Sequence, residues 1–213
     1  MNPEDFIVFI VVDDVCMREA LAELLASLGW QVVAFGSAGE YIAYPRPDLP
    51  ACLILDVELP DINGLDFQKQ ISHGDHPPIV FLTGHGDIPS SVRAIKYGAV
   101  DFLTKPFTER DLLEAIRSAV ERDRQARQGR AELESLRQRL ASLPPREREV
   151  LPLVVSGLLN KQAAAELGIS KVTRQIHRSK SMQKMEAASL ADLVRIAEQL
   201  QIPVTHSRRA GNT

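Results

Sequence analysis

The chain of 213 residues has little of what secreted or membrane proteins depend on. Its 2 cysteines, Cys16 and Cys52, match the spacing of neither a disulfide framework nor a zinc site. No apolar run approaches the roughly 18 residues that a membrane-spanning helix needs. The N-terminus carries Glu4 and Asp5 where a signal peptide would have basic residues. These absences favour a soluble protein of the reducing cytoplasm that has no membrane partner.

Acidic and basic residues are distributed unevenly along the chain. Residues 1–120 contain 8 Lys and Arg against 18 Asp and Glu, whereas residues 121–213 contain 17 against 10. An acidic surface suits a cation and a basic surface suits a polyanion. The division favours two domains of different function, and the alternative is that two surfaces merely differ in charge.

Five short apolar runs in the first half alternate with amphipathic segments. Each run is rich in Val, Ile, Leu or Phe and too short for a helix, as expected for strands that are covered on both faces. The alternation predicts a doubly wound α/β domain with a five-stranded parallel sheet. The expected strands are residues 7–12, 31–35, 52–55, 79–82 and 100–103.

A helical pattern begins at Thr108 and runs on into four leucines. Leu133, Leu136, Leu140 and Leu143 are spaced by three, four and three residues. This spacing is typical of a short coiled coil, and a solvated linker helix without a partner is the alternative. Gly129 is the expected weak point of the helix.

The remainder of the chain contains no strand pattern. Capping residues and glycines divide it into four expected helices, at residues 146–156, 160–167, 170–185 and 189–200. The tight turn Gly168-Ile169-Ser170 joins two of them, which is the mark of a helix-turn-helix.

Polar side chains are expected where the strands of the first half end. Asp13 and Asp14 follow the first strand, Asp56 the third, Thr83 the fourth and Lys105 the fifth. Ligands of open α/β sheets bind at the carboxyl ends of strands, so these side chains should share one crevice. Three carboxylates repel one another unless a cation lies among them, and an all-oxygen shell suits Mg²⁺ (or Mn²⁺).

Such a crevice favours in-line phosphoryl transfer to a carboxylate. Asp56 is the expected nucleophile because it stands alone at the end of the middle strand, whereas Asp13 and Asp14 form an adjacent pair suited to a metal. Lys105 would pair with a phosphoryl oxygen. Each aspartate taken singly would more often be a helix cap or a surface charge, and the convergence of five positions is what argues for a site.

The first half carries the motifs Val-Val-Asp13-Asp14, Asp56-Val-Glu-Leu-Pro60-Asp-Ile-Asn-Gly64, Leu-Thr83-Gly-His-Gly and Asp-Phe102-Leu-Thr-Lys105-Pro106-Phe. Over residues 6–121 they resemble bacterial response-regulator receiver domains. The resemblance implies a flavodoxin-like sheet of strand order 2-1-3-4-5, phosphorylation of Asp56 by a sensor histidine kinase, and a cis bond before Pro106. It also implies Mg²⁺ ligands, which would be Asp13, Asp14, Asp56 and the Glu58 backbone carbonyl.

The resemblance implies a switch as well. The Thr83 hydroxyl would move to the new phosphoryl group and Phe102 would swing into the vacated space, although a lone strand Phe is more often a static core ring. Homodimers would form on phosphorylation through a face that includes Val92, Ile95, Lys96 and Tyr97. Such a domain assists only its own phosphorylation and dephosphorylation, so it is not expected to be an enzyme.

The loop after Asp14 departs from this family. Val-Cys-Met separates Asp14 from Arg18, one residue fewer than the family usually has. We therefore expect the loop that carries the metal ligands to be reset.

The second half carries the motifs Pro-Pro-Arg-Glu-Arg-Glu-Val-Leu151, Gly157-Leu-Leu-Asn160-Lys161, Ala-Ala-Glu-Leu-Gly168-Ile-Ser170, Thr173, His177-Arg178 and Met182-Gln-Lys184-Met185. They resemble the LuxR-type helix-turn-helix of FixJ/NarL regulators. The expected DNA-binding residues comprise base readers and phosphate contacts, although a single Lys or Arg could equally lie on a solvated helix face. The positions of these motifs imply that Gln175, Ile176 and Ser179 contact the bases. The other expected DNA contacts are Lys161, Thr173, Arg174, Arg178, Lys180 and Lys184.

Two positions in this half also depart from the family. Arg174 and Ser181 stand where aliphatic residues usually pack the recognition helix, and burial of an unpaired Arg would cost several kcal/mol. This leaves an alternative, a signal-relay or titrating module with weak DNA binding.

The sequence thus predicts a receiver domain at residues 1–122, a helical linker at 123–142, an all-α LuxR-type domain of four helices at 143–201 and a disordered tail at 202–213. The expected function is that of a two-component response regulator that binds promoter DNA and acts on transcription together with RNA polymerase. A haloacid-dehalogenase-type phosphatase would need a second Asp where Glu58 stands. A dinucleotide-binding enzyme would need a Gly-rich turn after the first strand.

Overall fold

The computed structural model describes residues 6–72, 74–84, 88–156 and 179–203. The chain divides into two compact units, Met1–Gln128 and Gly129–Thr213. The division falls inside the predicted linker and within one long helix, α5 (Glu109–Ala141), which continues through Gly129. No helix in the described part of the chain is both long enough and apolar enough to cross a membrane.

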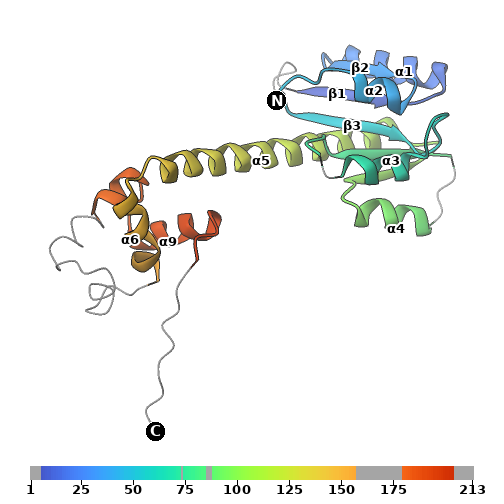
Figure 1. Cartoon of the computed structure of the whole chain (residues 1–213). Coiled ribbons are helices and arrows are strands. Elements are labelled where there is room, and N and C mark those ends of the chain that lie inside the picture. Colours follow the sequence, from blue (N-terminus) through green and yellow to red (C-terminus); the bar gives the residue numbers. More distant parts are fainter. Residues whose placement is uncertain (1–5, 73, 85–87, 157–178, 204–213) are drawn as a thin grey trace, which may run out of the picture. The chain divides into compact units, whose positions relative to one another are not determined.

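The first unit is built on one parallel sheet of strand order β2-β1-β3-β4-β5, which confirms the predicted topology. Each strand lies within one residue of its expected bounds. The strands are β1 (Ile7–Val11), β2 (Gln31–Phe35), β3 (Ala51–Asp56), β4 (Ile79–Thr83) and β5 (Asp101–Thr104) (Figure 1). β1, β3 and β4 are buried along their whole length, as their continuous apolar sequences require.

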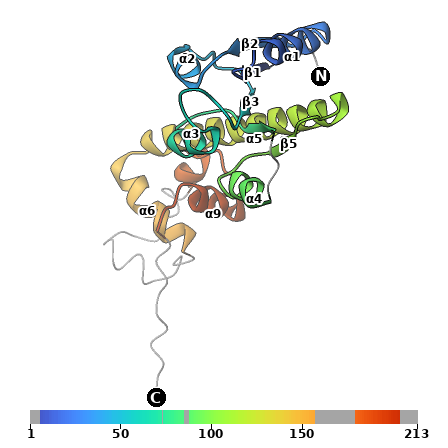
Figure 2. The same ribbon diagram turned by 90° about the vertical axis from the view of Figure 1, so that its right-hand side faces the viewer.

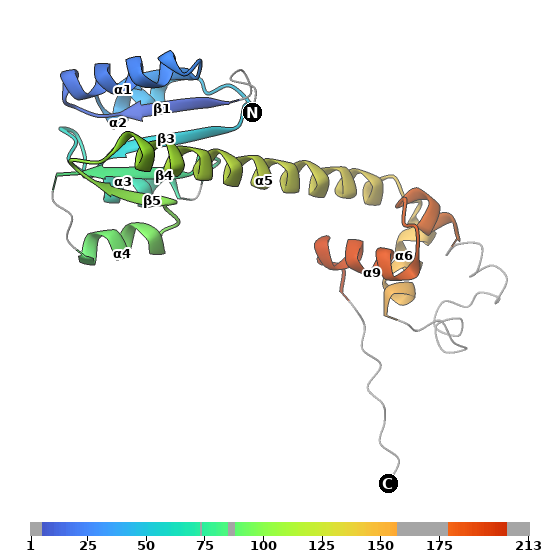
Figure 3. The same cartoon turned by 180° about the vertical axis from the view of Figure 1, so that it is seen from behind.

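Helices cover both faces of the sheet. α1 (Val15–Ser27) and the beginning of α5 pack on one face, through residues such as Leu25 and Ile116 (Figure 3). α2 (Ala38–Ala43), α3 (Gly64–Ile71) and α4 (Ile88–Lys96) lie on the other face (Figure 2). The sheet therefore separates two apolar cores, and its strand ends remain open to a site.

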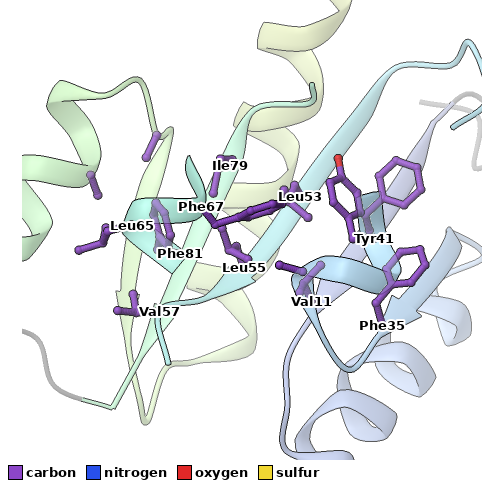
Figure 4. Close-up of a cluster of buried hydrophobic side chains, with 14 of the residues drawn as sticks. Val11, Phe35, Tyr41, Leu53, Leu55, Val57, Leu65, Phe67, Ile79 and Phe81 are labelled. Atoms are coloured by element: carbon purple, nitrogen blue, oxygen red, sulfur yellow. The ribbon is translucent and has the colours of Figure 1, made fainter. Parts of the chain in front are cut away.

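Aromatic rings fill the core beneath α2. The ring of Tyr41 lies 5.6 Å from Phe9, 5.7 Å from Phe35 and 6.2 Å from Phe67 between centroids, each in an edge-to-face arrangement. Figure 4 shows this cluster between α2, α3 and the sheet. Burial raises the pKa of the Tyr41 hydroxyl, and the nearby Arg46 opposes that shift.

A buried carboxylate joins α5 to the start of β3. Asp123 is 3% exposed and accepts the backbone N–H of Ala51 at 2.9 Å. It also accepts Nε of Arg127 at 2.8 Å, and Arg127 pairs in turn with Asp48. Asp123 thus satisfies a strand-end donor and has a cation beside it, which is the condition under which a buried charge is tolerated.

The second unit has a separate core. α6 (Pro145–Val155), the helical residues 179–184 and α9 (Leu190–Gln199) pack around the end of α5. Leu136 and Leu143 are buried in this core and Leu140 packs against it. Three of the four leucines of the predicted seam are therefore used within the chain, and coiled-coil pairing would require them to leave this core.

The C-terminal boundary lies slightly beyond its predicted place. Ser189 caps α9 as expected, by accepting the N–H of Asp192. Ile202, which was assigned to a disordered tail, instead donates its N–H to Ala197 at 2.9 Å and packs on the second core. Its apolar side chain continues the buried stripe of α9, which a boundary drawn at the helix end overlooks. The other tail residues from 204 on lie outside the described residues.

We expect Asp123→Ala to lower the free energy of unfolding of the first unit by about 2–4 kcal/mol, because it removes the buried acceptor of the Ala51 N–H and leaves Arg127 with Asp48 alone. Urea denaturation followed by the fluorescence of Trp30, the chain's 1 tryptophan, measures this unit, since Trp30 packs on Phe6 at 5.2 Å.

Asp66→Ala is the matched control. Asp66 also pairs with a cation, Lys69, at 2.6 Å, but on the exposed surface of α3, so its loss should leave the unfolding midpoint nearly unchanged. Equal effects of the two substitutions would contradict a special role for Asp123.

Candidate functional site

Three of the five predicted site residues meet at the carboxyl edge of the sheet. Asp56 is the last residue of β3, Thr83 is the last of β4, and Lys105 directly follows β5. Because these strands are parallel neighbours, their ends lie together: Asp56 is opposite Leu82, and Thr83 is opposite Thr104. The peptide bond between Lys105 and Pro106 is cis, as the receiver resemblance implied.

The Asp56 carboxylate is buried at the carboxyl edge of the sheet. It is 2% exposed, and its Oδ2 lies 2.5 Å from Nζ of Lys105. Its Oδ1 accepts the backbone N–H of Glu58 at 3.1 Å. The ammonium and the amide together compensate for the loss of water around the carboxylate.

Gly64 gives the loop after β3 its path. A Cβ at this position would lie 2.3 Å from the backbone oxygen of Asp56, so no other residue fits without movement of the backbone. The Gly64 N–H donates to the Val57 carbonyl at 2.8 Å, and Glu58 forms an antiparallel bridge to Asn63. This tight return explains in physical terms why the motif that begins at Asp56 ends in glycine.

The loop after β1 carries Asp13 and Asp14 on the surface, beside the start of α1. Both are exposed, and the Asp14 carboxylate accepts the N–H of Met17 at 2.7 Å, as the N-cap of α1. Asp13 Oδ1 accepts the N–H of Asp14 at 2.8 Å. Arg18 Nη1 donates to the carbonyls of Val12 at 2.6 Å and Asp13 at 3.0 Å.

The described residues contain no group of three or more His, Cys, Asp and Glu side chains gathered for a metal ion. The donor types nevertheless suit Mg²⁺, which prefers carboxylate and carbonyl oxygens. Asp13, Asp14, Asp56 and the Glu58 carbonyl supply such oxygens, and the carboxylates of Asp13 and Asp14 each also accept one backbone N–H.

Phe102 lies at the edge of the core. Its half-buried ring is 6.0 Å from the ring of Phe81 and packs against the α2–α4 side of the sheet.

α4 presents an apolar face to solvent. Val92 is 59% exposed, Ile95 is 50% exposed and Tyr97, just after the helix, is 49% exposed. Val92 and Ile95 are three residues apart and therefore neighbours on the helix surface. Nζ of Lys69 lies 5.7 Å from the centroid of the Tyr97 ring.

The predicted DNA-binding residues are described in part. Ser179 and Lys180 are exposed. Nζ of Lys184 lies 3.2 Å from Oε2 of Glu147, a buried residue of α6. Ser181 is fully buried, and its hydroxyl donates to the Glu147 carbonyl at 3.4 Å, so the polar side chain has a partner where an aliphatic one was expected. The other predicted contacts lie outside the described residues: Lys161, Thr173, Arg174, Gln175, Ile176 and Arg178.

A parallel sheet of order 2-1-3-4-5 with an aspartate–lysine pair at its edge, in a chain with a second, helical unit, agrees with the class of response regulators. The chain matches the model of the response regulator receiver domain over residues 8–117 and that of the luxR family of bacterial regulatory proteins over residues 141–197. It therefore belongs to the response-regulator family with a LuxR-type DNA-binding domain, and its function lies in transcriptional regulation.

Particular relatives cover nearly the whole chain. Nodulation protein W of Bradyrhizobium diazoefficiens is 50% identical over 95% of this chain and 90% of its own length. Response regulator protein TodT of Pseudomonas putida is 44% identical over 94% and 89%. The solved structure of the response regulator StyR matches with a TM-score of 0.78 and 44% identity, over 92% of this chain and 99% of that one.

We expect Lys184→Met to loosen the second unit, because Glu147 would remain buried without its cation. Hydrogen exchange of the amides of α6, followed by mass spectrometry, should show lower protection. Lys180→Met is the matched control, because it removes a charge from an exposed residue of the same helix. Equal loss of protection in both variants would show that the Glu147 pair has no special role.

Proposed function

We propose that a sensor histidine kinase phosphorylates Asp56 and that this modification controls the binding of the LuxR-type domain to promoter DNA. The observation that carries the proposal is the buried Asp56 carboxylate, placed at the end of the central strand and 2.5 Å from the Lys105 ammonium. Buried charge pairs at a strand edge are typical of functional sites in open α/β sheets.

Phosphoryl transfer needs a nucleophile and charge compensation. An oxygen of Asp56 attacks the phosphorus of a phosphohistidine, the new O–P bond forms as the N–P bond breaks, and the imidazole leaves with the electron pair. Lys105 then pairs with an oxygen of the transferred group. The chain assists the transfer of the phosphoryl group to its own aspartate, so its catalysis is limited to its own phosphorylation and dephosphorylation.

A divalent cation belongs to this chemistry. Asp13, Asp14, Asp56 and the Glu58 carbonyl would hold Mg²⁺ (or Mn²⁺). When bound, the ion would neutralise the charge of donor and acceptor. Lys105 supplies the positive charge on the other side of Asp56.

Thr83 and Phe102 would convert phosphorylation into a change of surface. A phosphoryl group brings up to two negative charges and three acceptor oxygens, which the Thr83 hydroxyl at the end of β4 can meet. Movement of the Thr83 side chain toward the phosphoryl group would free space at the sheet edge, and the half-buried Phe102 ring would turn into that space. The half-buried position of Phe102 on β5, beside Phe81 of β4, supports this role.

Dimerisation would use the apolar face of α4. Val92, Ile95 and Tyr97 form a patch that a second copy can cover, and Lys96 lies at its border. A two-fold dimer would place two helix-turn-helix units on a repeated half-site, where Lys and Arg contact phosphates and residues such as Gln175 read bases. The protein would act in the cytoplasm together with RNA polymerase.

A relay or titrating module with weak DNA binding is the second candidate. It rested on Arg174 and Ser181. The hydroxyl of Ser181 is satisfied by Glu147, so this residue no longer argues against a well-packed recognition helix. Relatives with names such as transcriptional regulatory protein FixJ also favour the first candidate.

Selection of random genomic fragments by the purified full chain tests the proposal. With Mg²⁺ and acetyl phosphate, we expect one sequence to be enriched, while intact mass shows one added phosphoryl group. Asp56→Asn should lose both responses, because the amide is no nucleophile. Asp66→Asn, an exposed acid on α3, should keep both.

Phosphorylation of Asp56 without enrichment of any sequence would favour the relay module. A phosphodonor response that persists in Asp56→Asn would show that Asp56 is not the acceptor.

A further inference from the structure

We infer that Gln68 of α3 is a positioning residue for α4, because it pins the last turn of α4 in the unphosphorylated chain and releases it when Asp56 is phosphorylated. This inference deepens the proposed function, since it rests on phosphorylation of Asp56 and on dimerisation through the face of α4. The observation behind it is a buried side-chain amide whose two ends are treated differently by their surroundings.

α4 has little apolar contact to hold it on the sheet. Among the side chains of α4 whose burial is described, Ala94 alone is buried, and it contributes a single methyl group to the core. Val92 and Ile95 are exposed. A helix with so few buried apolar contacts docks weakly, so one hydrogen bond supplies a large share of what fixes its position.

Gln68 supplies such a hydrogen bond from a helix that is firmly anchored. Leu65 and Phe67 of α3 are buried in the core cluster that Figure 4 shows. Gln68 is 1% exposed, and its Nε2 donates to the carbonyl of Ala94 at 3.2 Å. A side chain of a well-anchored helix thus holds the last turn of a loosely docked one.

The oxygen of the same amide is unsatisfied. Oε1 of Gln68 is buried and accepts no hydrogen bond from the residues that the structure describes. The reverse orientation of the amide would place this oxygen against the Ala94 carbonyl, so rotation of the group cannot satisfy it. A buried acceptor without a donor is unfavourable, and movement of α4 would admit water to it. The oxygen therefore opposes the docked position that the Nε2 bond favours.

These opposing contributions describe a helix that is poised between two positions. Phosphorylation needs to supply only a small free-energy difference to move α4, because the bond to Ala94 is partly offset by the buried oxygen. The backbone of α4 does not depend on Gln68, since the Ala94 carbonyl also accepts the N–H of Ala99 at 3.0 Å. Release of Gln68 therefore leaves the Ala94 carbonyl with a donor.

Gln68→Met removes the donor and the unsatisfied acceptor together, in a side chain of similar length. We expect the midpoint of thermal unfolding to stay the same or rise, because an unsatisfied buried group is lost. Hydrogen exchange of the α4 amides in the unphosphorylated chain, followed by mass spectrometry, should nevertheless become about three- to tenfold faster, as loss of one hydrogen bond allows. Gln70→Met, at an exposed position of the same helix, is the matched control and should leave both measurements unchanged.

Gln68→Asn separates the position of α4 from stability. Asn keeps the amide but is one methylene shorter, so it cannot keep the bond to the Ala94 carbonyl. We expect a lower unfolding midpoint, because the whole amide is then buried without partners, together with the same faster exchange of α4. Exchange that is unchanged or slower in Gln68→Met, and faster only in the destabilised Gln68→Asn, would show that Gln68 has a merely structural role.

The link to phosphorylation is measured on the full chain with Mg²⁺, with and without acetyl phosphate, while intact mass reports the state of Asp56. Sedimentation gives the dissociation constant of the dimer. Without the phosphodonor, Gln68→Met should dimerise about three- to tenfold more tightly than wild type, because the bond that favours the unphosphorylated position of α4 is lost. Its further gain on phosphorylation should be smaller than that of wild type by a similar factor.

Dimerisation of unphosphorylated Gln68→Met that is no tighter than in a phosphorylation-responsive wild type would overturn the inference. Failure of the proposed function appears separately, in the wild-type chain, as absence of a phosphoryl group on Asp56 or of any gain in dimerisation. Exchange of α4 in the unphosphorylated variants then still decides whether Gln68 holds the helix.

Discussion

The first unit depends on a charge buried at the end of its central strand. β3 runs through the middle of the sheet, and its last residue, Asp56, is removed from water. A carboxylate in that position is tolerated because β5 brings Lys105 alongside and the following loop offers the Glu58 amide. The cis bond before Pro106 and the close return at Gly64 belong to the segments that carry these partners. The same two partners would hold Asp56 in place for the phosphoryl transfer that we propose.

β3 is secured in a similar way at its other end. Ala51 donates its N–H to Asp123, a buried carboxylate of α5 that has Arg127 beside it. The strand that carries Asp56 is therefore bounded by two carboxylate–cation pairs, one in the site and one against the long helix. Apolar burial fixes the strand within the sheet, and these pairs fix its ends.

Sequence patterns were sufficient for the sheet and for the residues at its edge. Apolar runs bounded by polar residues located every strand within one residue, and parallel topology brings Asp56, Thr83 and Lys105 together. Asp123 could not be found in this way, because an Asp in a charged helix looks solvated until the tertiary structure buries it. For Asp14 the sequence left two interpretations, a metal ligand or a helix cap, and only the structure shows that its carboxylate caps α1. The leucines of α5 have the spacing of a coiled coil, but the same spacing serves any helix that packs on a core.

The burial of Leu136 and Leu143 has a consequence for how such proteins can be recombined. The last turns of α5 belong structurally to the DNA-binding unit, although they are covalently continuous with the helix of the receiver. A fusion made at Pro144, where the helix ends, would remove part of a hydrophobic core and expose the rest. The transferable module of this chain begins upstream, close to Gly129, so a change of its input domain would best be made inside the helix and not at its end.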